Sequence, residues 1–551
     1  MKTRRIDIRN TKKHASLYAY FEKQCHLAKN LQNTANFYIR NLHTGLAKEP
    51  EMRSRNEQDV IRVVWDSISK YNENQHTIFH KKALRISKLL QKHQISSMAA
   101  ASQMIEKVQS IKEFVCPTKE HWMLSYEELN AVLYFSDNRD YFTLPSQANQ
   151  QILRKVIKSW KSYFMALKAY AEHPDKFLGK PKMPGYKRAS YSTIHYTNQI
   201  INHFCSGERQ MLSFPDRNLT LCIGSRRELL DIVKVEVKPW NQMFVVLVTY
   251  DAENKDPVVP THPTHILGID SGVNNFMTVA ANVPSVSFLI DGRWLKSENQ
   301  YFNKKRAQLL SILTKGLDST RSTKTSKRLY ALSRKRELRF RDFFYKAAYR
   351  IVRYALDLKI EVIVCTHNEG QKQESNLGDT NNQNFVLIPF MRFFEILKHI
   401  AAESNIPVIL REESYTSKAS LLDKDDIPTY VKGAENNYTF SGNRIKRGLY
   451  RSKEGFLINT DINGACNVIR KQFPYAFDKM TKPEDFAYLM NTVHVITRQD
   501  LCHAKSPVPQ KKQQHHRSLH RRDQHNARFA KKLMYIQLFQ KKKATAVTAA
   551  A

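Results

Sequence analysis

The spacing of apolar residues changes twice along this chain of 551 residues, so no single fold class accommodates all of it. Up to about residue 180, apolar residues recur every three to four positions, as on one face of a helix. Over residues 180–263 they alternate with polar residues, which is typical of antiparallel strands. Beyond residue 264, short apolar strands alternate with helical segments, which is the pattern of an α/β sheet. The sequence therefore predicts several domains.

The first part is predicted to be helical over residues 11–179, after a short strand within residues 1–10. A long helix is expected at 16–42, and a polar helical region continues to about Glu127. A further helix starts at Leu144-Pro-Ser146, with Ser146 as its N-cap. It places large apolar residues on one face and most of its lysines on the others: Ile152, Val156, Trp160, Phe164 and Leu167 against Lys155, Lys158, Lys161 and Lys168. The pattern predicts a helical bundle with a basic outer surface.

Glycines and prolines mark the next boundary, at 179–188. Antiparallel strands are predicted after it, at 191–204, 211–223, 232–238 and 243–250. With the N-terminal strand added, they are expected to close into a small β-barrel, because closure removes exposed strand edges. The helical domain would then be inserted between the first strand of the barrel and the others.

The third part contains three short strands in quick succession, and then a helix, a strand, a helix and a strand. The predicted strands are 266–270, 276–281, 286–290, 361–365 and 407–411, and the helical stretches are about 300–358 and 389–404. This order is that of a ribonuclease H-like α/β fold. The sequence therefore predicts a sheet in which the fourth and fifth strands are neighbours.

The chain has 88 basic and 51 acidic residues, a formal net charge of +37. Such a charge repels itself unless a polyanion shares the space, so nucleic acid is the first candidate partner and an anionic membrane surface the second. No stretch of about 18 apolar residues and no signal peptide is found, which predicts a soluble, intracellular protein. The seven cysteines are widely spaced without a C-x-x-C pair, which excludes a disulfide framework and a zinc site of paired cysteines.

Two aspartates carry the pattern of a metal site. Asp270 ends a buried strand in Leu-Gly-Ile-Asp-Ser-Gly-Val-Asn-Asn, and Asp461 lies near the start of a helix in Asn-Thr-Asp-Ile-Asn-Gly-Ala-Cys-Asn. Each could serve only to cap a turn or a helix. In a ribonuclease H sheet, however, a final helix brings such a residue beside the first strand. The pair would then hold divalent ions for two-metal phosphodiester hydrolysis.

Several motifs in combination resemble TnpB, the transposon-encoded relative of type V CRISPR effectors. They are 266–275, 384–389, Glu413-Ser-Tyr-Thr-Ser-Lys418, 458–467, 36–41, 144–147 and 176–182. The resemblance implies a RuvC nuclease domain that cleaves DNA with two Mg²⁺ ions (or Mn²⁺). It also implies a guide RNA with a scaffold derived from the transposon end, and a double-stranded DNA target licensed by a short flanking motif. A cytoplasmic, nucleoid-associated prokaryotic protein with no membrane partner is expected.

The resemblance also implies a domain plan. It assigns residues 1–10 and 180–263 to a wedge β-barrel, 11–179 to a helical recognition domain, 264–413 and 455–475 to the RuvC domain, 414–454 to an insertion where the family carries its zinc ribbon, and 476–551 to a basic, partly disordered C-terminal region.

This chain departs from the family in two places. The insertion has no cysteines, so no zinc is expected. The family's middle catalytic glutamate normally ends the fourth strand, where this chain has Cys365, a poor Mg²⁺ ligand. A glutamate at the end of the neighbouring fifth strand would reach nearly the same space, which makes Glu413 the first candidate and Glu412, which faces the other way, the second. Glu369 is the third, and an incomplete, inactive site is the alternative.

Lysines and arginines dispersed over helices suit a protein that binds a guide RNA and its heteroduplex by shape and phosphate contacts. The predicted contacts are Lys155, Lys158, Lys161, Lys180, Lys182, Lys187, Arg188, Arg334, Arg336 and Arg339. Trp160, Trp240 and Tyr186 could stack on bases, although core packing is the commoner role of such rings. The sequence thus favours an RNA-guided DNA endonuclease with catalytic Asp270, Glu413 and Asp461. The alternatives are a non-cleaving RNA-guided repressor and a cut-and-paste transposase.

Overall fold

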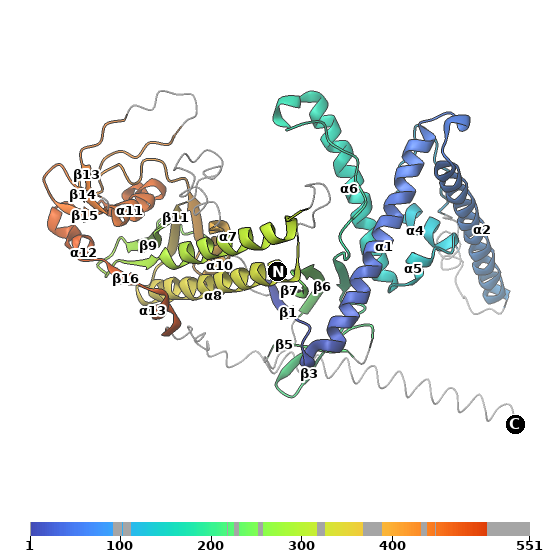
Figure 1. The fold of residues 1–551 in the computed structure, drawn as a ribbon, viewed down its shortest axis with the longest axis horizontal. Coiled ribbons are helices and arrows are strands. Elements are labelled where there is room, and N and C mark those ends of the chain that lie inside the picture. Colours follow the sequence, from blue (N-terminus) through green and yellow to red (C-terminus); the bar gives the residue numbers. More distant parts are fainter. Residues whose placement is uncertain are drawn as a thin grey trace. The chain divides into compact units, whose positions relative to one another are not determined.

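The computed structural model describes residues 2–91, 102, 112–216, 219–224, 231–251, 257–316, 325–366, 388–430, 438–446 and 448–503. The chain divides into two compact units (Figure 1). Unit 1 comprises Met1–Asp256 and Glu298–Arg339, and unit 2 comprises Pro257–Ser297 and Phe340–Ala551. No helix in these described ranges has the length and apolar character needed to cross a membrane.

The helices of unit 1 pack side by side around a shared apolar core. They are α1 (Ala15–Leu46), α2 (Arg55–Gln91), α4 (Tyr126–Phe135), α5 (Arg139–Phe142) and α6 (Ser146–Glu172). The predicted helical region up to Glu127 is wrong at its end, because residues 112–125 are not helical and α4 begins only after the N-cap Ser125. Pro117 interrupts the segment, and Ser125 and Glu128 form a capping box that starts the new helix.

The start of α6 differs from the prediction by one residue. Pro145 occupies the N-cap position, and Ser146 is the first residue of the helix. No side chain caps this end of α6. On the predicted apolar face of α6, Ile152, Val156 and Trp160 are buried, whereas Phe164 and Leu167 are half-buried. The indole Nε1 of Trp160 donates to Asn36 Oδ1 at 2.8 Å, so Trp160 is a core residue and not a base-stacking one.

The strands of unit 1 form two sheets. The first has the order β1 (Lys2–Ile8), β7 (Met243–Asp251), β6 (Asp231–Trp240) and β2 (Ile194–Thr197), and the second has β3 (Asn202–Ser206), β4 (Arg209–Ser213) and β5 (Thr220–Gly224). β1 pairs antiparallel with β7 along its whole length, so the helices are inserted between β1 and the later strands.

The expected closed barrel is not found among these described strands, because no hydrogen-bonded ladder joins the two sheets. The predicted single strand 191–204 is in fact two strands in different sheets. A turn at residues 198–200, of sequence Asn-Gln-Ile, redirects the chain between β2 and β3. The alternating pattern continues through this turn, which is why periodicity alone did not reveal it.

Unit 2 is built on a six-stranded sheet with the order β12-β11-β8-β9-β10-β16. Its strands are β8 (Ile266–Ser271), β9 (Asn275–Ala281), β10 (Phe288–Asp291), β11 (Val362–Thr366), β12 (Val408–Arg411) and β16 (His494–Ile496). The first three are antiparallel, and β11 and β12 run parallel to β8, so the fourth and fifth predicted strands are neighbours.

Two layers of helices cover the sheet of unit 2. α8 (Lys327–Asp357) and α10 (Phe390–Glu403) bury phenylalanines against Leu267 and Ile269 on one face. α11 (Thr460–Gln472) packs on the other face, against Ile266 and Val364. The predicted helical stretch 300–358 is two helices, α7 (Arg293–Thr314) and α8.

The sheet extends farther along the chain than the predicted boundary at residue 475. β16 pairs in parallel with β10, and α12 (Ala487–Met490) and α13 (Arg498–His503) flank it. Residues 476–503, which the sequence placed in the basic C-terminal region, therefore include a strand of the sheet of unit 2. A three-residue strand gives no detectable alternation, so the sequence pattern missed it. The predicted disorder of residues 504–551 lies outside the described part.

The insertion at 414–454 contributes to a small antiparallel sheet of β13 (Asn443–Lys446), β14 (Leu449–Arg451) and β15 (Leu457–Asn459). This sheet leads directly into α11, as Figure 1 shows. Tyr450 on β14 is buried, and its hydroxyl donates to the Lys418 carbonyl at 2.7 Å. The insertion is thereby fastened to the segment that follows β12.

Candidate active site

The parallel strands β8, β11 and β12 end at the same edge of the sheet of unit 2. Cys365 on β11 lies opposite Ile269 on β8, and Thr366 lies opposite Arg411 on β12. The residues just beyond these positions, Asp270 on β8 and Glu412 and Glu413 after β12, therefore lie along one edge.

Two glycines let α11 approach β8 closely enough to add Asp461 to this edge. A Cβ on Gly268 would lie 2.0 Å from the Ala465 carbonyl oxygen, and a Cβ on Gly464 would lie 3.0 Å from Asp270 Oδ2. A side chain at position 268 would collide with the backbone of α11, and one at position 464 would press on the Asp270 carboxylate, so the helix and the strand pack closely. The Asp270 carboxylate consequently packs against the first turns of α11, where Asp461 lies.

Asp461 is held in place from two sides. The side chain of Asn459 caps α11 by accepting from the backbone N–H of Asp461 at 2.9 Å. Asn275, the first residue of β9, donates from Nδ2 to Asp461 Oδ2 at 2.5 Å. Asn275 belongs to the Asp270 motif, so the two aspartate motifs are connected through this hydrogen bond.

The carboxylates at this edge act on one another electrostatically. The pKa of Asp270 is raised well above its ordinary value, first by burial of the carboxyl and then by the charges of Glu413 and Asp461. Thr366 opposes this by donating from Oγ1 to Asp270 Oδ1 at 3.3 Å. Two negative charges therefore act on Asp270, one from Glu413 and one from Asp461.

Cys365 lies near the end of β11, at the position whose residue type departs from the TnpB pattern. Its side chain is fully buried in the core, and burial raises the pKa of its thiol. The next residue, Thr366, makes the contact with Asp270 and also accepts the backbone N–H of Ser271 at 3.0 Å. Sequence reasoning missed Thr366, although its place one residue after Cys365 on a strand directs it to the opposite face.

Among the described residues, Glu412 makes its contacts with Ser414 and Lys471 and not with the other carboxylates. Its Oε1 accepts from the Ser414 backbone N–H at 2.6 Å, and its Oε2 pairs with Lys471 Nζ at 2.5 Å. Lys471 lies in the last turn of α11, with only 3% of its side chain exposed, and also donates to the carbonyls of Ser414 and Pro428. The third candidate, Glu369, lies outside the described residues.

Buried asparagines of α11 hold the segment beyond Glu413. Asn463 donates to the Ala419 carbonyl at 2.8 Å, and Asn467 donates to the carbonyls of Thr416 and Ala419 at 2.9 and 2.7 Å. With Lys471, they fix the chain that carries Glu413 to the helix that carries Asp461. A buried amide that satisfies backbone carbonyls in this way is costly to remove.

Replacement of Lys471 by methionine is expected to lower the free energy of unfolding of unit 2. The loss should be about 1–3 kcal/mol, less than for a fully buried pair because Glu412 is partly exposed. Thermal unfolding of Lys471→Met, Glu412→Gln and the double variant measures it. The double variant should lose less than the sum of the single losses, since the two residues share one interaction. Additive losses would show that the pair does not hold this segment.

The donor set suits a hard divalent cation. Asp270, Glu413 and Asp461 offer carboxylate oxygens, and the repulsion that Glu413 and Asp461 exert on Asp270 favours a bound positive charge. Among the described residues, no group of three or more His, Cys, Asp or Glu side chains is arranged to hold a metal ion. In this structure Asp270, Glu413 and Asp461 therefore do not form a ready-made three-ligand site.

The residues predicted to bind nucleic acid fall into two groups. Six are exposed and available to phosphates: Lys155, Lys158, Lys161, Lys180, Lys182 and Arg188. Four make contacts within unit 1. Lys187 donates to Ser192 Oγ, Arg334 to the Asn241 carbonyl and Arg336 to Asn299 Oδ1, and Arg339 pairs with Glu298.

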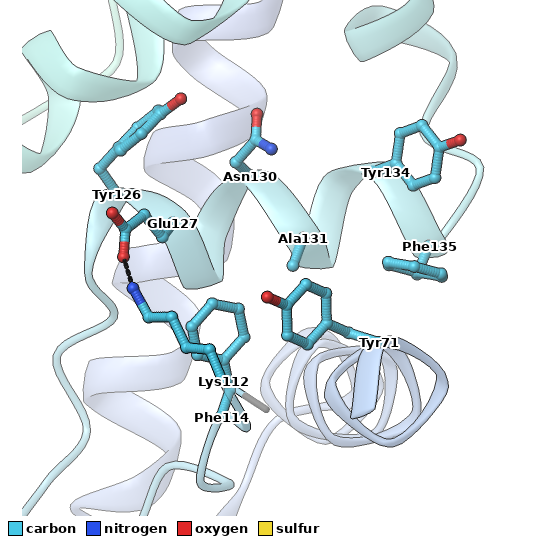
Figure 2. Close-up of a pocket in the computed structure, with 9 residues that line it drawn as sticks. All are labelled: Tyr71, Lys112, Phe114, Tyr126, Glu127, Asn130, Ala131, Tyr134 and Phe135. Atoms are coloured by element: carbon cyan, nitrogen blue, oxygen red, sulfur yellow. Dashed lines mark hydrogen bonds and ion pairs between the residues drawn. The ribbon is translucent and has the colours of Figure 1, made fainter. Parts of the chain in front are cut away.

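The helical part of unit 1 contains an aromatic cavity of about 230 Å³. Figure 2 shows it between α2 and α4, with Tyr71 and Phe114 stacked at 4.3 Å and an ion pair of Lys112 and Glu127 at its rim. The cavity brings together no pair of carboxylates and no nucleophile. It is not a candidate for the catalytic centre.

Residues 248–370 match the family model OrfB_IS605, described as "Probable transposase". The matched segment contains β8 to β11 and Asp270. This match confirms the resemblance to TnpB that the motifs indicated. No curated protein matches the chain significantly.

Solved structures show a remote similarity. A Cas12f1–sgRNA–target DNA complex is 13% identical, with 86% of this chain and 100% of that chain covered and a TM-score of 0.28. A CRISPR–Cas12f ternary complex is 14% identical, with 74% and 80% covered and a TM-score of 0.27. An AacC2c1–sgRNA–extended non-target DNA ternary complex is 8% identical, with 78% and 71% covered and a TM-score of 0.27. TM-scores this low do not establish a shared fold.

Proposed function

We propose that this protein is an RNA-guided DNA endonuclease that hydrolyses phosphodiester bonds at a single RuvC-type site in unit 2. The observation that carries the proposal is that Asp270, Glu413 and Asp461 come from three separate segments of the chain to one edge of the sheet, where burial and then the charges of Glu413 and Asp461 raise the pKa of Asp270. In a purely structural setting, the repulsion that Glu413 and Asp461 exert on the Asp270 carboxyl would cost stability without a benefit, whereas a cation site needs the three carboxylates together.

Asp270, Glu413 and Asp461 would hold two Mg²⁺ ions, with no zinc involved. Bound Mg²⁺ supplies an activated water and neutralises charge on the leaving oxygen. Asn275 and Thr366 orient the carboxylates of Asp461 and Asp270 through their hydrogen bonds. Lys471, Asn463 and Asn467 keep the chain around Glu413 fixed to α11, so that the third carboxylate stays at the edge.

The guide RNA is the second element of the proposal. A net charge of +37 exceeds what a single duplex contact needs, and exposed lysines on α6 and in the segment after it suit phosphate binding. A transposase-like match over residues 248–370 accords with a transposon-encoded protein of the TnpB type. A non-cleaving RNA-guided repressor is the alternative, and it differs in lacking the third carboxylate.

Sequencing of the RNA that copurifies with the protein tests the guided function. A defined scaffold RNA with a variable end is expected, and the complex should cut a matched double-stranded target in Mg²⁺. A protein without a defined RNA would contradict guidance. A protein with a defined RNA that binds the target and never cuts it would be the repressor.

A further inference from the structure

The segment that follows Glu413 carries aromatic rings that the proposed hydrolysis does not use. Tyr415 meets Tyr438 edge to face, with 5.1 Å between ring centroids, and lies 6.0 Å from the ring of Phe440. Tyr430 is close by, because its backbone N–H donates to Ser414 Oγ at 3.3 Å. Tyr430 and Tyr438 are 55% and 45% exposed, so solvent reaches this cluster two residues beyond a candidate metal ligand.

The backbone of Tyr415 is held in a conformation that tyrosine disfavours. Its φ of +60° lies in the left-handed region, where glycine and asparagine are usual. The turn is nevertheless fixed, since Lys418 and Ala419 both donate from their backbone N–H groups to the Tyr415 carbonyl at 2.9 Å. A residue that only had to form this turn would be glycine, so the tyrosine side chain itself points to a use.

A cation accompanies the ring. Lys418 Nζ lies 5.8 Å from the centroid of Tyr415, and the side chain of Lys418 is exposed. An aromatic face for a base, next to an ammonium group for a phosphate, is the combination with which proteins bind single-stranded nucleic acid. Stacking of this kind accepts every base, which suits a nuclease whose target sequence is read by a guide.

We infer that Tyr415, with Tyr430 and Tyr438, forms a stacking subsite for an unpaired base of the DNA strand that is cut at the carboxylates. Lys418 binds a phosphate of the same strand. The inference rests on the proposed function and adds a contact that fixes the strand beside the scissile bond. Bases within a duplex offer no free face, so the subsite selects single-stranded DNA.

The test uses the full chain with its guide RNA and targets in which nucleotides near the cut are replaced one at a time by abasic sites. At one or two positions the wild type should lose about tenfold in cleavage rate. Glycine suits the left-handed backbone, so Tyr415→Gly should fold normally. On the intact target its cleavage rate should be about tenfold below that of the wild type, and the abasic site should lower it no further. Tyr415→Phe, the matched control, keeps the ring and should cleave like the wild type.

Two results would overturn the inference: wild-type cleavage by Tyr415→Gly, or equal abasic losses in both proteins. Thermal unfolding confirms that Tyr415→Gly is folded, and Tyr415→Asn, which also tolerates the backbone, is the second variant.

A binding measurement separates this inference from the nuclease function. A single-stranded oligonucleotide with 2-aminopurine is added to the full chain in Ca²⁺, and stacking quenches its fluorescence. Quenching should occur with the wild type and Tyr415→Phe and be lost in Tyr415→Gly. If the wild type never cleaves but quenching depends on Tyr415, the proposed function fails and the subsite stands. If Tyr415→Gly quenches the fluorescence as much as the wild type does, the inferred subsite is refuted, whether or not the protein cleaves DNA.

Discussion

Asp270→Asn is expected to abolish cleavage and, at the same time, to stabilise the metal-free protein. The cleavage rate should fall at least about a thousandfold, about 4 kcal/mol in activation free energy, because an amide cannot replace a carboxylate as an Mg²⁺ ligand. The stabilisation follows from the burial of the Asp270 carboxyl and from its repulsion by Glu413 and Asp461, both of which penalise a charge that the amide lacks. A gain of about 1–3 kcal/mol in the free energy of unfolding is expected at pH 8.

The pH dependence of this gain has a definite sign. The pKa of Asp270 is raised in the folded protein, so the folded state binds more protons than the unfolded state between about pH 4 and that raised pKa. Wild-type stability therefore falls as pH rises through this window, and the advantage of Asp270→Asn grows. Below about pH 4 both states of the wild type are protonated, and the advantage vanishes.

Thermal unfolding in EDTA at a series of pH values measures the gain. Mg²⁺ should then raise the unfolding temperature of the wild type and leave that of Asp270→Asn unchanged, since a ligand stabilises only the state that binds it. A variant that still cleaves at more than about a hundredth of the wild-type rate would remove Asp270 from the site. Equal stability at every pH would show that the carboxylates do not repel one another.

Glu413→Gln and Glu412→Gln are expected to separate catalysis from stability. Glu413 acts on Asp270, so its replacement should reduce cleavage about a thousandfold and leave the unfolding temperature equal or higher. Glu412 pairs with the nearly buried Lys471, so its replacement should lower stability and reduce cleavage much less. The two residues are adjacent and chemically identical, which makes each the control for the other.

The measurements are single-turnover cleavage at 25 °C, where both variants are folded, and thermal unfolding. The reverse pattern, with cleavage lost in Glu412→Gln and retained in Glu413→Gln, would assign the third carboxylate to Glu412. Retention of full cleavage by both variants would leave residues outside the described ranges, such as Glu369, as the source of that carboxylate.

The sequence revealed those parts of unit 2 that depend on local pattern. Apolar runs and strand–helix alternation predicted five of the six strands and the parallel neighbours β11 and β12. They also predicted that Asp270 meets α11. Alternation also offered Glu413 and Glu412 as opposite-facing candidates. Glu413 was the first candidate and Glu412 the second, and the pattern gave no sign of the pairing of Glu412 with Lys471, which lies 59 residues away in sequence.

What the sequence did not reveal depends on contacts between distant segments or on very short elements. Thr366 on β11 contacts Asp270 on the neighbouring strand β8, and a threonine in the sequence does not by itself indicate such a contact. β16 has three residues and is a strand only because β10 offers it an edge. The strands of unit 1 form two sheets where a barrel was expected, because a short turn after β2 leaves the alternation intact while changing the direction of the chain.

The pairing of β16 with β10 also sets an order of events during protein synthesis. The ribosome releases β1 to β7 and the helices between them long before residues 494–496 emerge, so most of unit 1 can fold while unit 2 still lacks its outermost strand. α11 emerges before that strand, and Asp461 therefore reaches Asp270 on a sheet with one edge still open. The carboxylate edge needs Asp461 and is thus completed after most of unit 1 has had time to fold.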